Sequence, residues 1–262
     1  MKRRDFLATT GISLAAATAA EGEGSVLGGS RHYLEWREYQ LLPGDGRKAF
    51  HEFLEGVALP AARRAGTGPI GVFQTQYGPS KPSVTILIPH VSLESVATFA
   101  DRLADDAQFL RDGASFLGAE LSHPNYVRME SSLMVAFAGM PRVEVPPQHE
   151  AGQKRIFELR VYESHSSRAA KKKIEMFNDG GEIEIFRRTG LQPVFFGETI
   201  IGSRMPNLTY MLVFDDMVAR DAAWDRFRND AGWKTLSADP QYKDTVSNIT
   251  DYILTPLEYS QI

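Results

Sequence analysis

The chain contains no cysteine, and this absence removes several kinds of chemistry. Disulfides, thiolate nucleophiles, cysteine-ligated zinc, iron–sulfur clusters and a lipidated N-terminal cysteine all require the missing thiol. The six histidines do not pair at a metal-ligand spacing, and no His-Glu-x-x-His motif occurs. The sequence therefore predicts no metal site.

An excess of basic residues is also missing. Lysine and arginine number 29 against 33 aspartates and glutamates, which gives a net charge of −4. Nucleic-acid binding needs a clear basic excess, so no nucleic-acid partner is expected. Glycine-rich phosphate loops and the Gly-x-Ser-x-Gly nucleophile motif are absent as well, so nucleotide binding and serine hydrolase chemistry have no support.

Long hydrophobic runs are absent too, and the most apolar stretch lies at the N-terminus. There Arg3 and Arg4 precede Phe6-Leu7 and an alanine-rich run over residues 8–20. That run is too short and too weakly hydrophobic to span a bilayer. We interpret residues 1–20 as a twin-arginine export signal and residues 21–30 as a flexible segment, which predicts a periplasmic or extracellular protein with no membrane span after signal removal.

The rest of the chain has an ordinary globular composition, 43% hydrophobic and 24% charged, and it shows a repeat. Residues 31–140 and 155–262 each predict the order strand, helix, strand, strand, helix, strand, and a proline-containing linker over 141–154 separates them. The expected strands are 32–39, 70–77, 83–88 and 126–137, then 156–162, 194–201, 208–214 and 246–254. The expected helices are 44–64, 92–110, 166–188 with a break at 178–181, and 216–231.

The two halves agree in register. The pattern Glu-x-Arg-x-Tyr at residues 35–39 returns 123 positions later at residues 158–162, and Ser83–Ile88 lies 124 positions before Asn207–Leu212. This predicts an α+β fold of tandem ferredoxin-like βαββαβ repeats. Helices cover only one face of each such sheet, so we expect the two open faces to pack sheet to sheet around a barrel-like space.

Several segments of the second half carry a family resemblance. They are Phe157–Tyr162, Ile185–Gly190 with Pro193–Glu198, Met205–Phe214, Trp224-x-x-Phe227 and Thr255–Ser260. Residues 155–262 resemble the NIPSNAP family strongly, and residues 31–140 resemble it in part, with Gln76 where the second half has Glu198. The resemblance implies a dimeric α+β-barrel fold and no established enzymatic activity.

Eight polar residues form the predicted pocket. In the first strand of the second half, Phe157, Leu159 and Val161 are expected under the helices, so their neighbours would face the space between the sheets or solvent. The candidate pocket residues are Glu35, Arg37, Tyr39, Glu158, Arg160, Tyr162, Glu198 and Arg204. They would either hold a ligand through charge-assisted hydrogen bonds or form cross-strand ion pairs.

Two roles are possible for Glu198. It shares a strand face with apolar residues, and a carboxylate there is costly without a partner. It would pair with Arg160 or Arg204, or it would be a proton-transfer group with a raised pKa. The sequence assigns no catalytic residue.

Two functions follow as hypotheses. The first is an exported small-molecule-binding or structural barrel protein whose ligand is small and apolar or aromatic. The alternative is a cofactor-independent oxygenase or isomerase acting on a phenolic or quinone-like substrate, or a haem protein of the same barrel superfamily. No cofactor is predicted, because the sequence lacks an evident proximal histidine for haem and the Gly-x-x-Asp-Gly stretch of exported barrel peroxidases. An exposed sheet face would instead make the chain a homo-oligomer.

Overall fold

The computed structural model describes residues 30–42, 44–75 and 82–262. The predicted export signal, residues 21–29 of the predicted flexible segment, Gln76 and most of the turn predicted before Ser83 lie outside the described residues. No helix within the described part of the chain is long and apolar enough to cross a membrane.

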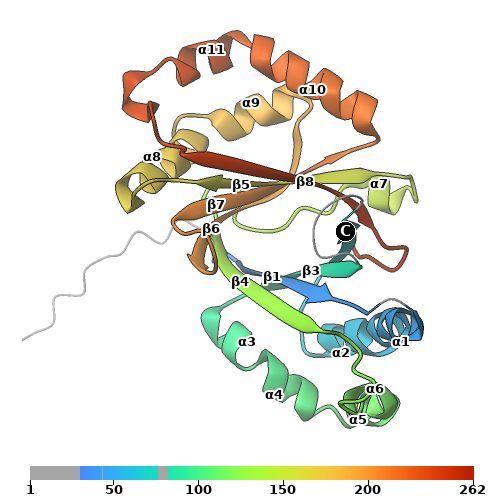
Figure 1. Ribbon diagram of the computed structural model, residues 1–262. Coiled ribbons are helices and arrows are strands. Elements are labelled where there is room, and N and C mark those ends of the chain that lie inside the picture. The colour runs from blue at the N-terminus through green and yellow to red at the C-terminus, as the bar shows by residue number, and fades with distance from the viewer. Residues whose placement is uncertain (1–29, 43, 76–81) are drawn as a thin grey trace, which may run out of the picture.

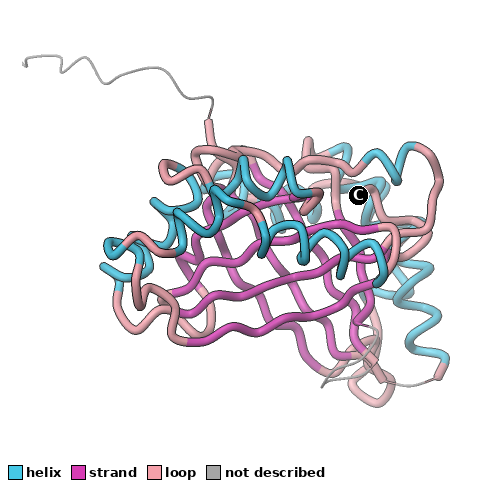
Figure 2. The backbone as a smooth tube through the Cα atoms, turned by 90° about the horizontal axis from the view of Figure 1, so that it is seen from above, coloured by secondary structure: helices cyan, strands magenta, loops and turns pink. Residues whose placement is uncertain are grey.

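Eight antiparallel strands close into a barrel in the order β1-β3-β2-β8-β5-β7-β6-β4. The first-half strands are β1 (Tyr33–Gln40), β2 (Gly71–Thr75), β3 (Ser83–His90) and β4 (Arg128–Ala136). The second-half strands are β5 (Ile156–Glu163), β6 (Gln192–Ile201), β7 (Asn207–Phe214) and β8 (Asn248–Pro256). Seen from above, these strands form a central grid with the helices around it (Figure 2).

Each half contributes four neighbouring strands, and two seams join the halves. Strand β2 pairs with β8, and β4 pairs with β6, so every strand has a neighbour on both sides. The predicted fold class, tandem ferredoxin-like repeats forming a barrel, is confirmed. At the second seam Gly197 allows the strands to approach, because a Cβ there would lie 2.9 Å from Cβ of Met134.

Helices cover the outside of the barrel in two layers (Figure 1). The first half supplies α1 (Asp45–Phe53), a π-helical turn (Leu54–Ala58), α2 (Leu59–Arg64), α3 (Leu93–Ala97), α4 (Phe99–Ala104), α5 (Ala107–Asp112) and α6 (Ala114–Leu117). The remaining α-helices are α7 (Pro147–Glu150), α8 (Ser167–Asn178), α9 (Glu182–Thr189), α10 (Met217–Asn229) and α11 (Ala231–Ser237), with a 3-10 turn at Pro240–Tyr242.

Local signals explain where several helices begin and end. Ser92 caps α3, since its hydroxyl accepts a hydrogen bond from the backbone N–H of Ser95 at 3.1 Å. The predicted helix over residues 92–110 is divided into three short segments, α3, α4 and α5, which periodicity alone did not indicate. The predicted break in the second half is confirmed, because α8 ends at Asn178 and α9 begins at Glu182 after the left-handed Gly181.

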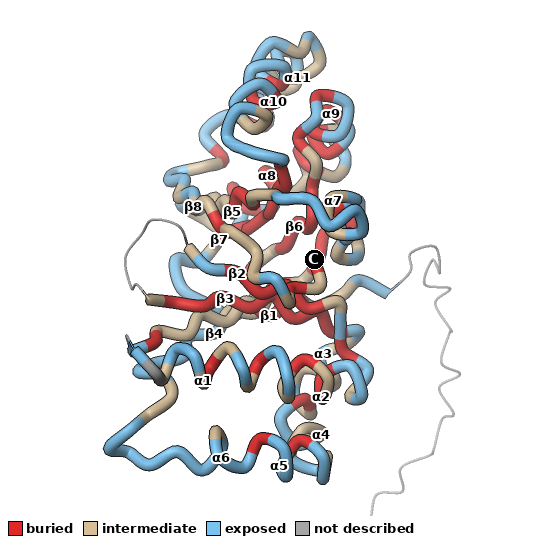
Figure 3. The backbone as a smooth tube through the Cα atoms, turned by 90° about the vertical axis from the view of Figure 1, so that its right-hand side faces the viewer, coloured by how far each residue is buried: buried red, intermediate tan, exposed pale blue. Residues whose placement is uncertain are grey.

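Three apolar clusters stabilise the molecule. One fills part of the barrel and includes Leu34, Phe157 and Phe195. The other two lie between the barrel wall and its helices, one in each half. Strands β3 and β7 are buried throughout, whereas β4 and β8 are mostly intermediate or exposed. Figure 3 shows red strand segments between the outer helices.

This arrangement corrects the predicted faces of the first strands. Phe157 and Leu159 point into the barrel, where they join the interior cluster. Glu158 lies under the helices instead, hydrogen-bonded to α10, and Tyr162 packs against the apolar cluster of that layer. The prediction was reversed because helix side chains, rather than a ligand or the opposite sheet, satisfy this polar row.

Candidate functional site

A cavity of about 300 Å³ lies within the barrel at one end. It is found where β1 and β5 end and where β3, β4 and β7 begin. Its apolar and aromatic lining consists of Trp36, Met134, Leu159, Val161, Tyr252 and Leu254. Its polar lining consists of Glu38, Gln40, Thr75, Thr85, Glu130, Ser132, Thr199, Ser203, Arg204, Asn207 and Thr209. The cavity thus combines an apolar surface with many hydrogen-bonding groups.

Two carboxylates face this cavity from neighbouring strands. Glu38 of β1 and Glu130 of β4 stand directly opposite each other in the antiparallel ladder. Burial raises the pKa of Glu38, and the nearby Glu130 carboxylate raises that pKa further. In the described part of the chain, neither side chain has an ion pair or a side-chain hydrogen bond. Among the described residues the pair has no basic partner.

Several hydrogen-bonding groups in the cavity near Glu38 and Glu130 also lack a partner among the described residues. Thr85 of β3 stands opposite Glu38 on the other side of β1 and is only 3% exposed. Its hydroxyl, the indole N–H of Trp36 and the hydroxyl of Tyr252 make no hydrogen bond to any described residue. Among the described residues, the Arg204 side chain donates a hydrogen bond to the Thr250 hydroxyl alone, at 3.3 Å. A bound molecule would therefore find both donors and acceptors available.

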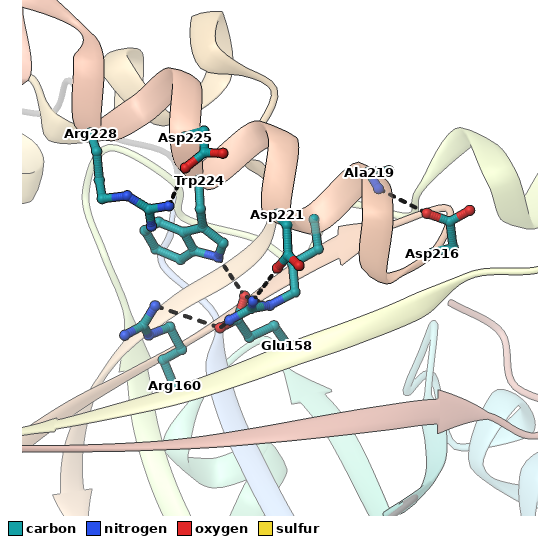
Figure 4. Close-up of polar contacts among 9 residues, drawn as sticks. Glu158, Arg160, Asp216, Ala219, Asp221, Trp224, Asp225 and Arg228 are labelled. Atoms are coloured by element: carbon teal, nitrogen blue, oxygen red, sulfur yellow. Dashed lines mark hydrogen bonds and ion pairs between the residues drawn. The ribbon is translucent and has the colours of Figure 1, made fainter.

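The polar residues predicted on the first strand of the second half lie between the barrel wall and α10, outside the cavity. Glu158 is fully buried and accepts hydrogen bonds from Arg220 at 2.6 and 3.0 Å and from the indole N–H of Trp224 at 2.7 Å (Figure 4). Arg160 lies 3.5 Å from the same carboxylate and stacks over the Trp224 ring at 4.6 Å. These contacts join the barrel wall to α10, and the row does not line the cavity.

Tyr162 extends this buried layer. Its hydroxyl accepts a hydrogen bond from Tyr210 at 2.9 Å, and burial raises its pKa. Nearby, Lys173 of α8 donates to Glu182 of α9 at 2.7 Å, and both side chains are almost fully buried. The layer is a network of paired polar groups, as structural residues require.

The first-half row is paired in the same way. Arg37 and Ser131 donate to the Glu35 carboxylate, the latter at 2.7 Å, and His90 Nε2 lies 3.4 Å away. Burial alone would raise the pKa of Glu35, but the nearby His90 ring and the hydrogen bonds from Arg37 and Ser131 lower it to about 2. Tyr39 packs against Phe50 in the helix layer. The three residues face the helices, as in the second half.

Glu198 and Arg204 complete the predicted set. Glu198 stands beside Leu208 on the helix-facing side of β6, is half-buried, and has no ion pair within the described residues. The predicted pairing with Arg160 or Arg204 is therefore absent from that part of the chain. Of the eight predicted residues, Arg204 is the one found among those lining the cavity.

Sequence reasoning missed Glu38, Glu130 and Thr85. A signal for the first existed, because Glu38 follows Leu34 and Trp36 on the apolar face of its strand. A carboxylate on that face needs a partner or a ligand. The pairing with Glu130 depends on strand register across 92 residues, which alternation within one strand does not reveal.

One histidine to consider as a ligand of haem is His51. This residue lies on α1, outside the barrel, with Nδ1 2.7 Å from the Tyr259 hydroxyl. Histidine, the most common proximal ligand of haem, does not occur among the described residues that line the cavity. The described lining of the cavity therefore does not fit haem held by a histidine.

Comparison with known proteins shows structural similarity over most of the chain and a family match over its second half. The chain is similar to a proposed monooxygenase from Lactobacillus acidophilus (9% identity, TM-score 0.56), covering 86% of this chain and 94% of that one. It is also similar to a proposed monooxygenase from Fusobacterium nucleatum (11% identity, TM-score 0.51), covering 87% and 93%. At these identities the likeness establishes the barrel fold alone.

The second half has a more specific match. A NIPSNAP family protein of unknown function from Agrobacterium tumefaciens aligns over 39% of this chain and 87% of its own, at 20% identity and TM-score 0.35. No curated protein matches the chain. The family model described as NIPSNAP matches residues 157–261, so this part of the barrel is similar to the NIPSNAP family.

Proposed function

We propose that the protein binds a small molecule inside the barrel, at the end where Trp36 and Tyr252 line the cavity. An eight-stranded barrel either fills its interior with side chains or holds one small ligand. Here one cluster fills part of the interior, and about 300 Å³ stays open beside it. That open volume, lined in part by Trp36, Thr85 and Tyr252, whose polar groups make no side-chain hydrogen bond to a described residue, is the observation that carries the proposal.

The lining indicates what kind of molecule fits. Aromatic and aliphatic side chains suit an apolar or aromatic body, and ligand sites commonly add a few convergent polar groups that fix orientation. The ligand therefore has an apolar or aromatic part and at least one polar group. We further propose that the protein is exported by the twin-arginine route, so the ligand is met outside the cytoplasm.

A fragment screen followed by protein NMR tests the binding proposal. Val161→Trp and Thr75→Trp each place a large ring into the cavity from a different strand and should abolish the shifts that a bound fragment causes. Ile249→Trp is the matched control, because Ile249 lies on a neighbouring strand with its side chain 43% exposed and outside the cavity lining. Fragments that bind all three variants equally well would show that the cavity is not the site.

Proton transfer is the second candidate function, and Glu38 is the observation that favours it. A half-buried carboxylate with a raised pKa, unpaired and facing a cavity, is suited to accept a proton from a phenol or an enolisable carbon. A bound fragment with an enolisable C–H group should then exchange that carbon-bound hydrogen in deuterated water, and Glu38→Gln should stop the exchange. Equal exchange by the wild-type and variant proteins would remove this candidate.

A further inference from the structure

The acid pair in the cavity suggests a class of ligand. Resting on the proposed binding function, we propose that the barrel binds a small organic cation, a protonated amine with an aromatic or apolar body. Its ammonium group is placed between Glu38 and Glu130, beside the Thr85 hydroxyl. Its body lies against the aromatic and aliphatic lining.

The first argument is electrostatic. Like charges directly opposite each other on adjacent strands repel, and this repulsion destabilises the empty barrel. Elsewhere in the described structure the buried acids Glu35, Glu158 and Glu182 each have a basic partner. Glu38 is half-buried and Glu130 is exposed. Neither has a basic partner among the described residues, so a positive group supplied by a ligand would relieve the repulsion between them.

The second argument is the set of neighbours around the pair. Thr85, 3% exposed and without a hydrogen-bond partner in the described chain, adds a hydroxyl acceptor next to Glu38. An ammonium group has three donors, and two carboxylates and one hydroxyl would satisfy them. The rings of Trp36 and Tyr252 also line the cavity and attract cations through their π faces.

A metal ion fits these residues less well. Within the described residues, no three histidine, aspartate or glutamate side chains come together in a group able to hold a metal. Divalent cations of the calcium type take six or more oxygen ligands, usually including several carboxylates. Two carboxylates beside an apolar lining are better matched to an organic ammonium.

A pair of probes of nearly equal shape tests the proposal. Phenethylamine and its neutral counterpart phenethyl alcohol are titrated into the protein while NMR shifts are recorded. The wild type should bind the amine about tenfold more tightly, as expected for a charge-assisted hydrogen bond. Glu38→Gln and Glu130→Gln should each remove most of that preference, because each weakens binding of the amine more than binding of the alcohol.

Glu94→Gln is the control, because it removes the same charge from the exposed surface of α3. It should keep the preference. Equal binding of both probes to the wild type would overturn the cation proposal and leave the cavity proposal standing. Binding of neither probe, or binding unaffected by Val161→Trp, would count against the cavity itself. Displacement of the amine by an equal concentration of calcium chloride would reassign the acid pair to a metal ion.

Discussion

The buried carboxylate of Glu158 accepts a hydrogen bond of 2.7 Å from the indole N–H of Trp224, which stands 66 residues later in the chain. Arg220 binds the same carboxylate through two further hydrogen bonds. Three donors from one helix thus converge on one strand residue. This contact fixes α10 against the barrel.

Glu158→Gln should therefore lower the free energy of unfolding by about 2 kcal/mol, since it weakens charge-assisted hydrogen bonds in a buried place. Urea denaturation measures the change. Asp221→Asn is the control, because Asp221 contacts the same Arg220 at 2.7 Å while its side chain stays 65% exposed. Its effect should be below about 1 kcal/mol. Similar losses in the two variants would show that burial of Glu158 is unimportant.

The pair Lys173–Glu182 gives a second stability prediction. Lys173→Met leaves a buried acid without its cation and should cost about 3–5 kcal/mol in unfolding free energy. The double variant Lys173→Met with Glu182→Leu should recover most of that loss, because no buried charge is left unpaired. Lys172→Met, next in sequence and paired with the partly exposed Glu175 instead, should change stability little. A double variant no more stable than the single one would contradict this account.

Glu35 predicts how stability depends on pH. Its pKa in the folded protein is about 2, below the ordinary value of 4.5, so folding favours the ionised form. The stabilisation is complete above pH 4.5 and is lost as the pH falls from there toward 2. The loss is on the order of 3 kcal/mol. Denaturation at several pH values in this range measures the free energy of unfolding. For Glu35→Gln this free energy should depend less on pH, and an unchanged dependence on pH would assign the acid sensitivity to another residue.

Replacing Glu38 should increase the stability of the unliganded protein, although it weakens amine binding. Glu38→Gln removes the repulsion from Glu130 and should stabilise the unliganded protein by about 0.2–1 kcal/mol at neutral pH. Because the pKa of Glu38 is raised, this gain should shrink as the pH falls and Glu38 takes up a proton. Thermal unfolding at several pH values measures it. A destabilised variant at neutral pH would mean that Glu38 has a partner in the folded protein.

Amine binding should follow the same titration. The ammonium needs an ionised Glu38, so affinity should fall with decreasing pH, starting above the range of an ordinary glutamate. The other charged or titratable groups lining the cavity are Glu130, Arg204 and Tyr252. Titrations of phenethylamine into Glu130→Gln separate the contribution of Glu130 from that of Glu38. Binding that does not change with pH would exclude Glu38 from the contact.

Much of the architecture could be predicted from sequence because the two halves repeat it. The alternation in residues 35–39 and 158–162 indicated which residues share a strand face. It did not indicate which face is inside, since a barrel covered by helices buries both. The deciding partners, Arg220 and Trp224, lie 62 and 66 residues away on a helix. Similarly, the Glu38–Glu130 pair exists only once β1 and β4 are in register.

The repeat has one consequence for the cavity. Glu38 corresponds to Val161 in the second half, and the strand neighbour that corresponds to Glu130 is Thr250. Two identical subunits forming the same barrel would bring four carboxylates to it. Because both copies are joined in one polypeptide, one half can carry the charge while the other stays neutral. Fusion thus frees the binding site from two-fold symmetry, and an asymmetric ligand can be held in a single orientation.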